Sequence, residues 1–303
     1  MTNRLFDKLQ QTLRGQVAIA EPLAKHTTWR IGGPADLFLR PLDVADLVNA
    51  LSLLRSHGTP WLAIGSGSNL LMRDGGFRGA IIHLGHFRDA VFDESARVRA
   101  GAGLGLMRLI RLAVERGLGG LEPLAGIPGT VGGAVAMNAG AMGREIGSLV
   151  DSVLLAGADG IEEWPADRLA FGYRRSTLPP GRVISGVKLQ LQPGNRETLQ
   201  QDVAVRLRHR RTAQGVGRPN AGSVFKNPPG ESAWKLVDQA GMRGARAGQA
   251  QVSELHGNFI VNLGGATAED VLTLIDLVRD RVEEMTGIRL ETEVRIVGSP
   301  KDL

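Results

Sequence analysis

The 303-residue sequence contains no cysteine. This absence excludes disulfides, thiolate nucleophiles, cysteine-ligated zinc and iron–sulfur clusters. Aromatic residues make up only 4% of the chain, with a single tyrosine, which argues against a stacking platform for single-stranded nucleic acid. His83 and His86 lack a third ligand at usable spacing, so no metal site is expected.

Long hydrophobic runs are also scarce. The one long uncharged stretch, LAGIPGTVGGAVAMNAGAM over residues 124–142, contains five glycines, a proline and an asparagine. It therefore predicts a buried loop rather than a membrane span. The first residues, MTNRLFDKLQQTLRG, mix charges into apolar positions, which is typical of a short amphipathic helix and not of a signal peptide. A cytoplasmic protein is expected.

The chain is basic, with a formal charge of +5 and a pI near 10. This charge suits an anionic partner, whether a nucleic acid, a membrane surface or a phosphorylated small molecule. Part of it is a run of arginines on an expected helix over 196–211, at Arg206, Arg208, Arg210 and Arg211. Most such runs are solvated faces, and no nucleic-acid-binding module is visible.

The length and the hydrophobic pattern predict an α+β protein of two or three domains. Helical spacing of apolar residues, with capping residues or glycine at the ends, predicts helices over 44–57, 104–116, 233–240 and 267–287. Short strands are expected at 37–39, 60–64, 80–84, 97–100 and 259–262, with several more between 148 and 191. The last segment, LETEVRIV, alternates strictly and predicts a strand over 290–297. The charged helix over 196–211 is expected to link two domains.

Two glycine-rich segments are candidates for ligand binding. IGSGSNLLMRDGG begins at Ile64, and its Gly65, Ser66, Gly67, Ser68 and Asn69 offer amides and hydroxyls to an anion without formal positive charge. A tight turn between strands is the plainer interpretation of this loop alone. The second segment has Gly126, Pro128, Gly129, Gly132 and Gly133, more glycines than a turn needs, which favours close approach to a large flat ligand. Together they suggest a dinucleotide, although neither segment has the Rossmann pattern.

Three further candidates carry chemistry. Ser223, in NAGSVFKNP, has the usual composition of a turn. Arg174, in FGYRRS beside the only tyrosine, Tyr173, could clamp a carboxylate or be a solvated turn residue. Glu293 could equally be a solvated strand residue that pairs with Arg295. Each position has both a structural and a functional interpretation when taken alone.

In this order, the motifs TTWRIGGPAD, GSGSNLLMRDGG, LAGIPGTVGGAVAMNAGAMG, GYRRS, AGSVFKNP, GNFIVN and LETEVRIVG resemble the MurB family, the UDP-N-acetylenolpyruvoylglucosamine reductases of bacterial cell-wall synthesis. The resemblance implies an FAD-binding domain of the vanillyl-alcohol-oxidase (PCMH) type over 1–195, with two α+β subdomains at roughly 1–84 and 85–195. A smaller C-terminal α+β substrate domain would follow over 196–303. The short stretch 173–186 looks like the second structural type of the family, which lacks a substrate-covering tyrosine loop.

The implied reaction transfers hydride from NADPH to FAD, and then to the enolpyruvyl ether of UDP-N-acetylglucosamine enolpyruvate. The product is UDP-N-acetylmuramate, a peptidoglycan precursor. The implied partners are this sugar nucleotide and NADPH, and the expected protein is a monomer without nucleic-acid binding or membrane insertion. A flavin-dependent oxidase of the same cofactor fold, and a nucleic-acid-binding protein built on the basic helix, are the alternatives.

The resemblance also implies residue roles. Ser223 would be the proton donor, Arg174 would supply positive charge to the substrate carboxylate, and Glu293 would match the catalytic acid. Glu293 is then expected either to have a raised pKa or to orient its neighbours. Gly65–Asn69 would hold the FAD pyrophosphate, and Tyr173, Lys226 and Asn227 are weaker candidates for substrate binding. The residues implied beside the flavin are Gly126, Ile127, Pro128, Gly129, Gly132, Gly133 and Ala134.

Overall fold

A computed structural model describes residues 2–301. The chain forms two compact units: unit 1 comprises Met1–Ile19, Leu37–Gly65 and Gly79–Arg210, and unit 2 comprises Ala20–Asp36, Ser66–Arg78 and Arg211–Leu303. Each unit has its own cluster of buried apolar side chains. The boundary at Gly65 falls inside the first glycine-rich loop.

Three helices of unit 1, α1, α2 and α3, form where apolar spacing predicts them. Leu5, Leu9 and Leu13 are all buried, which confirms the amphipathic N-terminal helix. Asp43 caps the next helix by accepting a hydrogen bond from the backbone N–H of Asp46 at 3.0 Å, as its sequence position predicts. The α-helices that begin in this unit are α1 (Thr2–Thr12), α2 (Val44–Ser56), α3 (Leu106–Glu115), α4 (Val131–Ala136) and α5 (Arg196–Gln214).

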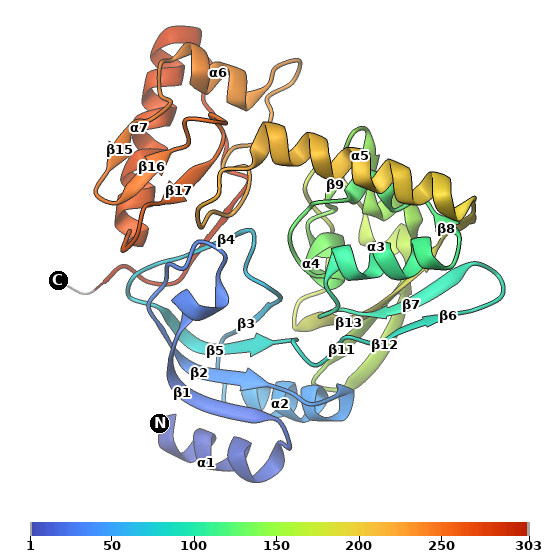
Figure 1. Cartoon of the computed structure of the whole chain (residues 1–303). Coiled ribbons are helices and arrows are strands. Elements are labelled where there is room, and N and C mark those ends of the chain that lie inside the picture. The colour runs from blue at the N-terminus through green and yellow to red at the C-terminus, as the bar shows by residue number, and fades with distance from the viewer. Residues whose placement is uncertain (1, 302–303) are drawn as a thin grey trace. The chain divides into compact units, whose positions relative to one another are not determined.

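The largest sheet of unit 1 is five-stranded, with order β12-β11-β13-β7-β6, and all its neighbours are antiparallel. The α4 helix packs on its β13 and β7 strands, and α3 packs on α4 (Figure 1). Three of its strands lie between 148 and 191, which confirms the predicted change of pattern there. Its strands are β6 (Ala90–Phe92), β7 (Arg97–Gly101), β11 (Val150–Gly157), β12 (Gly160–Pro165) and β13 (Arg182–Gln190).

A four-stranded sheet has order β1-β2-β5-β3, and within it β3 pairs with β5 in parallel. Its strands are β1 (Gln16–Pro22), β2 (Pro34–Arg40), β3 (Trp61–Ile64) and β5 (Phe77–His83). Two-residue strands and 3₁₀ turns complete the segments outside the C-terminal region. They are η1 (Leu23–His26), β8 (Leu118–Gly119), η2 (Glu122–Leu124), β9 (Gly140–Ala141), β10 (Arg144–Glu145), η3 (Ile146–Leu149), η4 (Ala166–Leu169) and β14 (Gln192–Pro193).

The apolar segment 124–142 differs from the expected loop because α4 occupies its centre. The Thr130 side chain caps α4 by accepting from the Gly133 N–H. Gly132 lies so close to Ala102 that a Cβ on it would come within 2.7 Å of the Ala102 Cβ. The glycine therefore serves helix packing, a use that the count of glycines alone could not reveal. Among residues 2–301, no helix is long and apolar enough to cross a membrane.

In unit 2, α7 packs on the small sheet β15-β16-β17, and α6 packs on α7 (Figure 1). The predicted capping box of Thr267 and Asp270 is present, and Gly287 ends α7 with φ +72°. The carboxylate of Asp74 also accepts from the Ala268 N–H at 2.8 Å, so the end of the first glycine-rich segment secures the start of α7. The elements are β4 (Leu70–Met72), α6 (Ala233–Gln239), β15 (Arg246–Ala247), β16 (Ala250–Val252), β17 (Ile260–Asn262), α7 (Ala268–Thr286) and β18 (Arg295–Val297).

The predicted last strand over 290–297 is regular only in β18, where it pairs in parallel with β4. Upstream, the backbone N–H groups of Glu293 and Val294 both donate to the Val224 carbonyl, at 2.7 and 3.4 Å. Two residues thus face one on the opposing segment. This bulge-like irregularity interrupts the ladder at Glu293, and side-chain alternation does not reveal it.

Candidate active site

The two glycine-rich segments meet within unit 1. A Cβ on Gly65 would lie 2.3 Å from the Thr130 hydroxyl, so glycine permits the loop after β3 to approach the N-terminus of α4. In unit 2, Gly67 has φ +63°, and a Cβ on it would lie 2.3 Å from the His26 carbonyl oxygen. Both glycines are therefore required by the protein's own contacts.

The residues present nevertheless fit a diphosphate-containing cofactor. Gly126 and Gly129 have φ values of +82° and +129°, which turn their amides in directions that other residues rarely allow, and Gly133 is exposed. In unit 2, the Thr28 hydroxyl is buried, and within residues 2–301 it has no hydrogen-bond partner. Amides and hydroxyls without formal charge suit such a ligand, and the binding roles of Gly65–Asn69 and of the 126–134 residues stay predictions.

Arg174 lies in unit 1 on a tight turn between Gly172 and Arg175. These two residues exchange backbone hydrogen bonds of 3.0 and 3.1 Å, and Arg174 itself has φ +57°, a left-handed conformation that costs free energy for a non-glycine residue. Its guanidinium lies 5.0 Å from the ring centroid of Tyr173, which is 48% exposed. The arginine that the motif singles out therefore lies on this turn and is partly buried.

Asn138 holds this turn in place. It is 1% exposed, and its side-chain amide donates to the Gly172 carbonyl at 3.0 Å and to the Glu145 carboxylate at 2.6 Å. Its side-chain oxygen accepts from the Gly147 N–H at 3.0 Å. The Ser176 hydroxyl secures the other end of the turn by donating to the Ala136 carbonyl at 2.9 Å. The position of Arg174 therefore depends on a buried asparagine that follows α4.

Ser223 and Glu293 come together in unit 2. The segment after Ser223 runs antiparallel to the segment before β18: the Glu293 N–H donates to the Val224 carbonyl, and Phe225 bridges to Thr292. Within the described residues, the partly buried Ser223 hydroxyl has no hydrogen-bond partner. A hydroxyl that the fold does not use is available to act on a ligand.

Asn258 fixes the Ser223 segment. It is 4% exposed, and its side chain accepts from the Phe225 N–H and donates to the Phe225 carbonyl, both at 2.8 Å. Its backbone carbonyl accepts from the Val224 N–H at 2.9 Å. Asn258 thus makes the backbone hydrogen bonds that a neighbouring strand would make on this side of the segment.

Asn69, predicted as a phosphate-loop residue, contacts the Glu293 region directly. Its side-chain amide donates to the Glu293 carbonyl at 3.3 Å, and its own carbonyl accepts from the Arg295 N–H at 3.0 Å. Within unit 2, the first glycine-rich loop and the terminal segment are therefore tied together. Sequence separation concealed this link.

The weaker substrate candidates already have partners. The Lys226 ammonium pairs with the Glu291 carboxylate at 3.1 Å, and the Asn227 side chain accepts from the Ala233 N–H at 3.0 Å, at the start of α6. Both are accessible enough to exchange these partners for a ligand, since the Lys226 side chain is 37% exposed and Asn227 is exposed. Their substrate contacts stay predictions.

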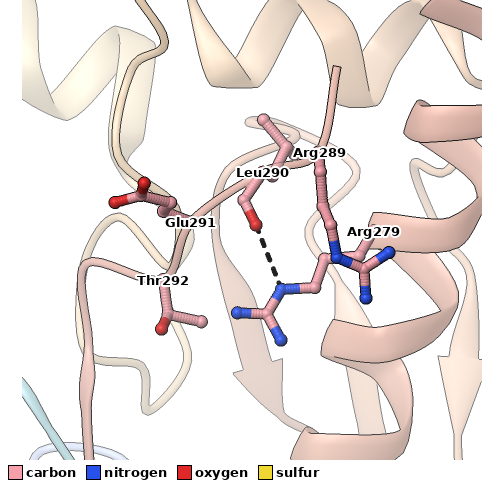
Figure 2. Close-up of a pocket in the computed structure, with 5 residues that line it drawn as sticks. All are labelled: Arg279, Arg289, Leu290, Glu291 and Thr292. Carbon is pink, nitrogen blue, oxygen red and sulfur yellow. Dashed lines mark hydrogen bonds between the residues drawn. The ribbon is translucent and has the colours of Figure 1, made fainter. Parts of the chain in front are cut away.

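Unit 2 contains a pocket of about 490 Å³, lined by Arg279, Arg289, Leu290, Glu291 and Thr292, which Figure 2 draws as sticks. Arg279 donates to the Leu290 carbonyl at 3.1 Å and pairs with Asp276 at 3.3 Å. Arg289 pairs with Glu283. Because both cations have carboxylate partners, this pocket offers little net charge, and the predicted catalytic residues do not line it.

Sequence reasoning missed Asn138 and Asn258 as individual residues, although both lie in motifs that carry the family resemblance. Asparagine is common in turns, so neither has a periodicity or spacing that would single it out. Among the described residues, no cluster of His, Asp or Glu has the arrangement of a metal site.

The chain matches two family models: an FAD binding domain over residues 35–162, and the C-terminal domain of UDP-N-acetylenolpyruvoylglucosamine reductase over 214–297. It is 55% identical to the reductase of Syntrophotalea carbinolica, covering 97% of this chain and 98% of that one. The crystal structure of MurB from Thermus caldophilus superposes with TM-score 0.79 at 37% identity, covering 94% and 99% of the two chains.

Berberine bridge enzyme from Eschscholzia californica shares the fold of part of the chain, with TM-score 0.51 at 17% identity over 63% of this chain and 44% of that one. This likeness supports the predicted α+β fold, and the family model over residues 35–162 supports the FAD-binding domain. Sequence identity of 55% to a reductase over nearly the full length of both chains, together with both family models, shows the family. The chain belongs to the UDP-N-acetylenolpyruvoylglucosamine reductase family.

Proposed function

We propose that the chain reduces UDP-N-acetylglucosamine enolpyruvate to UDP-N-acetylmuramate, with FAD as cofactor and NADPH as hydride source. The observation that carries this proposal is the pairing of the Ser223–Lys226 segment with Glu291–Glu293 in a chain 55% identical to a reductase. The Ser223 hydroxyl, which has no hydrogen-bond partner among the described residues, therefore lies on the segment that pairs with the Glu293 segment. A hydroxyl and an acid are the groups that protonation after hydride addition requires.

Bound FAD supplies hydride transfer between NADPH and the enolpyruvyl alkene. Hydride addition at the terminal CH₂ moves negative charge onto the adjacent carbon and its carboxylate. The protein must stabilise this charge and protonate that carbon, and these are separate tasks. The residues that would hold FAD are Gly65–Asn69 and the 126–134 loop.

Ser223 donates the proton to the adjacent carbon, since its hydroxyl has no competing acceptor among the described residues. Arg174 supplies fixed positive charge to the carboxylate from a turn that the side chains of Asn138 and Ser176 hold in place. Glu293 acts either in its protonated form, as a hydrogen-bond donor, or by orienting its neighbours. Tyr173, Lys226 and Asn227 contribute to binding of the sugar nucleotide.

The test is a visible absorption spectrum of the purified protein under anaerobic conditions. We expect a flavin band that NADPH bleaches and that UDP-N-acetylglucosamine enolpyruvate restores. Rapid recovery in air with peroxide release, and none with the sugar nucleotide, would instead indicate an oxidase. A protein that neither carries nor takes up FAD would overturn the proposal.

The same proposal places the enzyme in the cytoplasm, because its nucleotide substrates are cytoplasmic, and it treats the enzyme as a monomer. It assigns FAD binding to residues 1–195 and substrate binding to 196–303. Light scattering of the FAD-loaded protein tests the oligomeric state. A stable dimer would contradict the monomer.

A further inference from the structure

The run of arginines on α5 predicts a solvated face. Arg210 does not fit this prediction, because it is partly buried. The residues of α5 that pack against the core of unit 1 are Leu199, Val203 and Leu207, spaced four residues apart. Arg210 follows three residues later on the same stripe and is partly buried, whereas Arg208 and His209 are exposed. An arginine therefore stands where the helix pattern calls for an apolar residue.

The Arg210 side chain lies directly on the second glycine-rich segment. A Cβ on Gly126 would come within 2.6 Å of Arg210 Cδ and 3.5 Å of its Nε. Gly126 also has φ +82°, so glycine is required there twice, by conformation and by this contact. The stem of Arg210 is thus held against backbone, which limits where its guanidinium can reach.

The charge of Arg210 lacks a counterpart. Within residues 2–301, it makes no ion pair or hydrogen bond, whereas Arg206, one turn earlier, pairs with Asp202 at 2.8 Å. Burial, followed by the nearby positive charge of Arg174, lowers the pKa of Arg210 from its ordinary value. A desolvated guanidinium that has no acceptor of its own is unfavourable, and an anion bound to Arg210 would lower that cost.

We propose that Arg210 is a substrate-binding residue that, with Arg174, forms a two-guanidinium site for the enolpyruvyl carboxylate. The inference rests on the proposed function. Two guanidiniums can present planar forks to one carboxylate, and a bound anion lowers their mutual repulsion. The carboxylate is favoured over a phosphate because the neighbour of Arg210 is the residue assigned to that carboxylate.

The experiment measures ligand binding to the FAD-loaded, oxidised enzyme without NADPH, from the change in the flavin spectrum. The variant is Arg210→Gln, and Arg206→Gln is the matched control on the same helix face. We expect Arg210→Gln to raise the Kd for UDP-N-acetylglucosamine enolpyruvate roughly 10- to 100-fold, in line with loss of one charge-assisted hydrogen-bonded pair. UDP-N-acetylglucosamine, which lacks the carboxylate, should bind Arg210→Gln and the wild type equally. FAD content and the KM for NADPH should not change.

Arg210→Lys keeps the charge without the fork and should fall between the wild type and Arg210→Gln. An unchanged Kd in both variants would overturn the proposal. Equal weakening of both sugar nucleotides would move Arg210 to the diphosphate, and loss of FAD would move it to the cofactor. A wild-type chain that takes up FAD but ignores the enolpyruvyl substrate would instead refute the proposed function.

Discussion

Arg174 and Ser223 belong to different compact units, and one buried asparagine holds each of their segments. Asn138 bonds to Glu145, Gly147 and Gly172, and it supports a turn in which Arg174 has φ +57°. Asn258 instead binds both backbone groups of Phe225, in an extended segment that begins at Ser223. An asparagine side chain therefore holds a strained turn in one unit. In the other unit, an asparagine side chain makes the backbone hydrogen bonds that a neighbouring strand would otherwise make. The two supports should fail in different ways.

The largest expected effect is that of Ser223→Ala. Loss of general acid catalysis should slow reoxidation of the reduced enzyme by the enolpyruvyl substrate about 10²- to 10⁴-fold. Reduction by NADPH should be unchanged, because that step needs no proton from Ser223. Stopped-flow absorbance measures the two half-reactions separately. If both slowed equally, Ser223 would not be the proton donor.

Arg174→Ala should affect the same half-reaction, by about 10²- to 10³-fold, because a fixed positive charge at the developing anion is lost. Unlike Ser223→Ala, it should also raise the Kd of the substrate, since the carboxylate is already charged before hydride arrives. Arg175→Ala, on the adjacent exposed residue, is the control. Normal turnover in Arg174→Ala would remove this residue from the catalytic set.

Asn258→Ala tests the extended support. It leaves the buried N–H and carbonyl of Phe225 without partners, which should lower the free energy of unfolding by about 3 kcal/mol and slow the proton-donating half-reaction. Asn258→Asp keeps the acceptor for the N–H but turns a buried carboxylate oxygen toward the Phe225 carbonyl, so we expect a loss at least as large as that of the Ala variant. Urea denaturation and stopped-flow absorbance measure both effects. Equal stability of the Ala variant and the wild type would show that Asn258 is not the support.

Asn138→Ala tests the support of the Arg174 turn. Comparison with Asn138→Gly separates the loss of hydrogen bonds from the added backbone strain. Asn138 has φ +42°, so alanine adds backbone strain to the lost hydrogen bonds, whereas glycine loses only the bonds. We expect unfolding free energies lowered by about 2 kcal/mol for Ala, and by less for Gly. Both variants should raise the KM for the enolpyruvyl substrate but not for NADPH, because the Arg174 turn loosens. A raised KM for NADPH alone would contradict this role.

Sequence periodicity predicts the elements whose stability is local or amphipathic. The N-terminal helix, and the helix with the Thr267–Asp270 capping box, form as expected because hydrophobic spacing and capping lie within one segment. The candidate residues came from motif resemblance rather than from such rules. Long-range support could not be predicted: α4 depends on packing against Ala102, and Asn258 binds a residue 33 positions away. Arg210 differs again, because its place on the buried stripe of α5 is evident only once the burial of its apolar neighbours is known.

The smallest expected effect is a pH dependence of the hydrogen bonds that Asn258 makes, which those of Asn138 should lack. The Asn258 N–H donates to Nδ1 of His256 at 3.3 Å, so that nitrogen must be unprotonated, and no histidine is bonded to Asn138 among the described residues. Burial lowers the pKa of His256 and the charge of Arg243 adds to this shift, although the carboxylate of Asp238 opposes it. The neutral ring is therefore favoured in the folded state. Its contribution to stability is present above the unfolded-state pKa of about 6.5 and is lost as the pH falls through the folded-state value.

Hydrogen exchange at the Val224 and Phe225 amides should therefore lose protection as the pH falls below about 6.5, relative to His256→Gln at the same pH. Gln can accept the Asn258 hydrogen bond without titrating, and comparison at matched pH removes the intrinsic pH dependence of exchange. The Gly172 and Arg175 amides of the Arg174 turn should show no such difference between the two proteins. An equal loss of protection at the Val224–Phe225 amides and at the Gly172 and Arg175 amides would mean that acid weakens the fold generally. The hydrogen bonds of Asn258 would then have no pH sensitivity of their own.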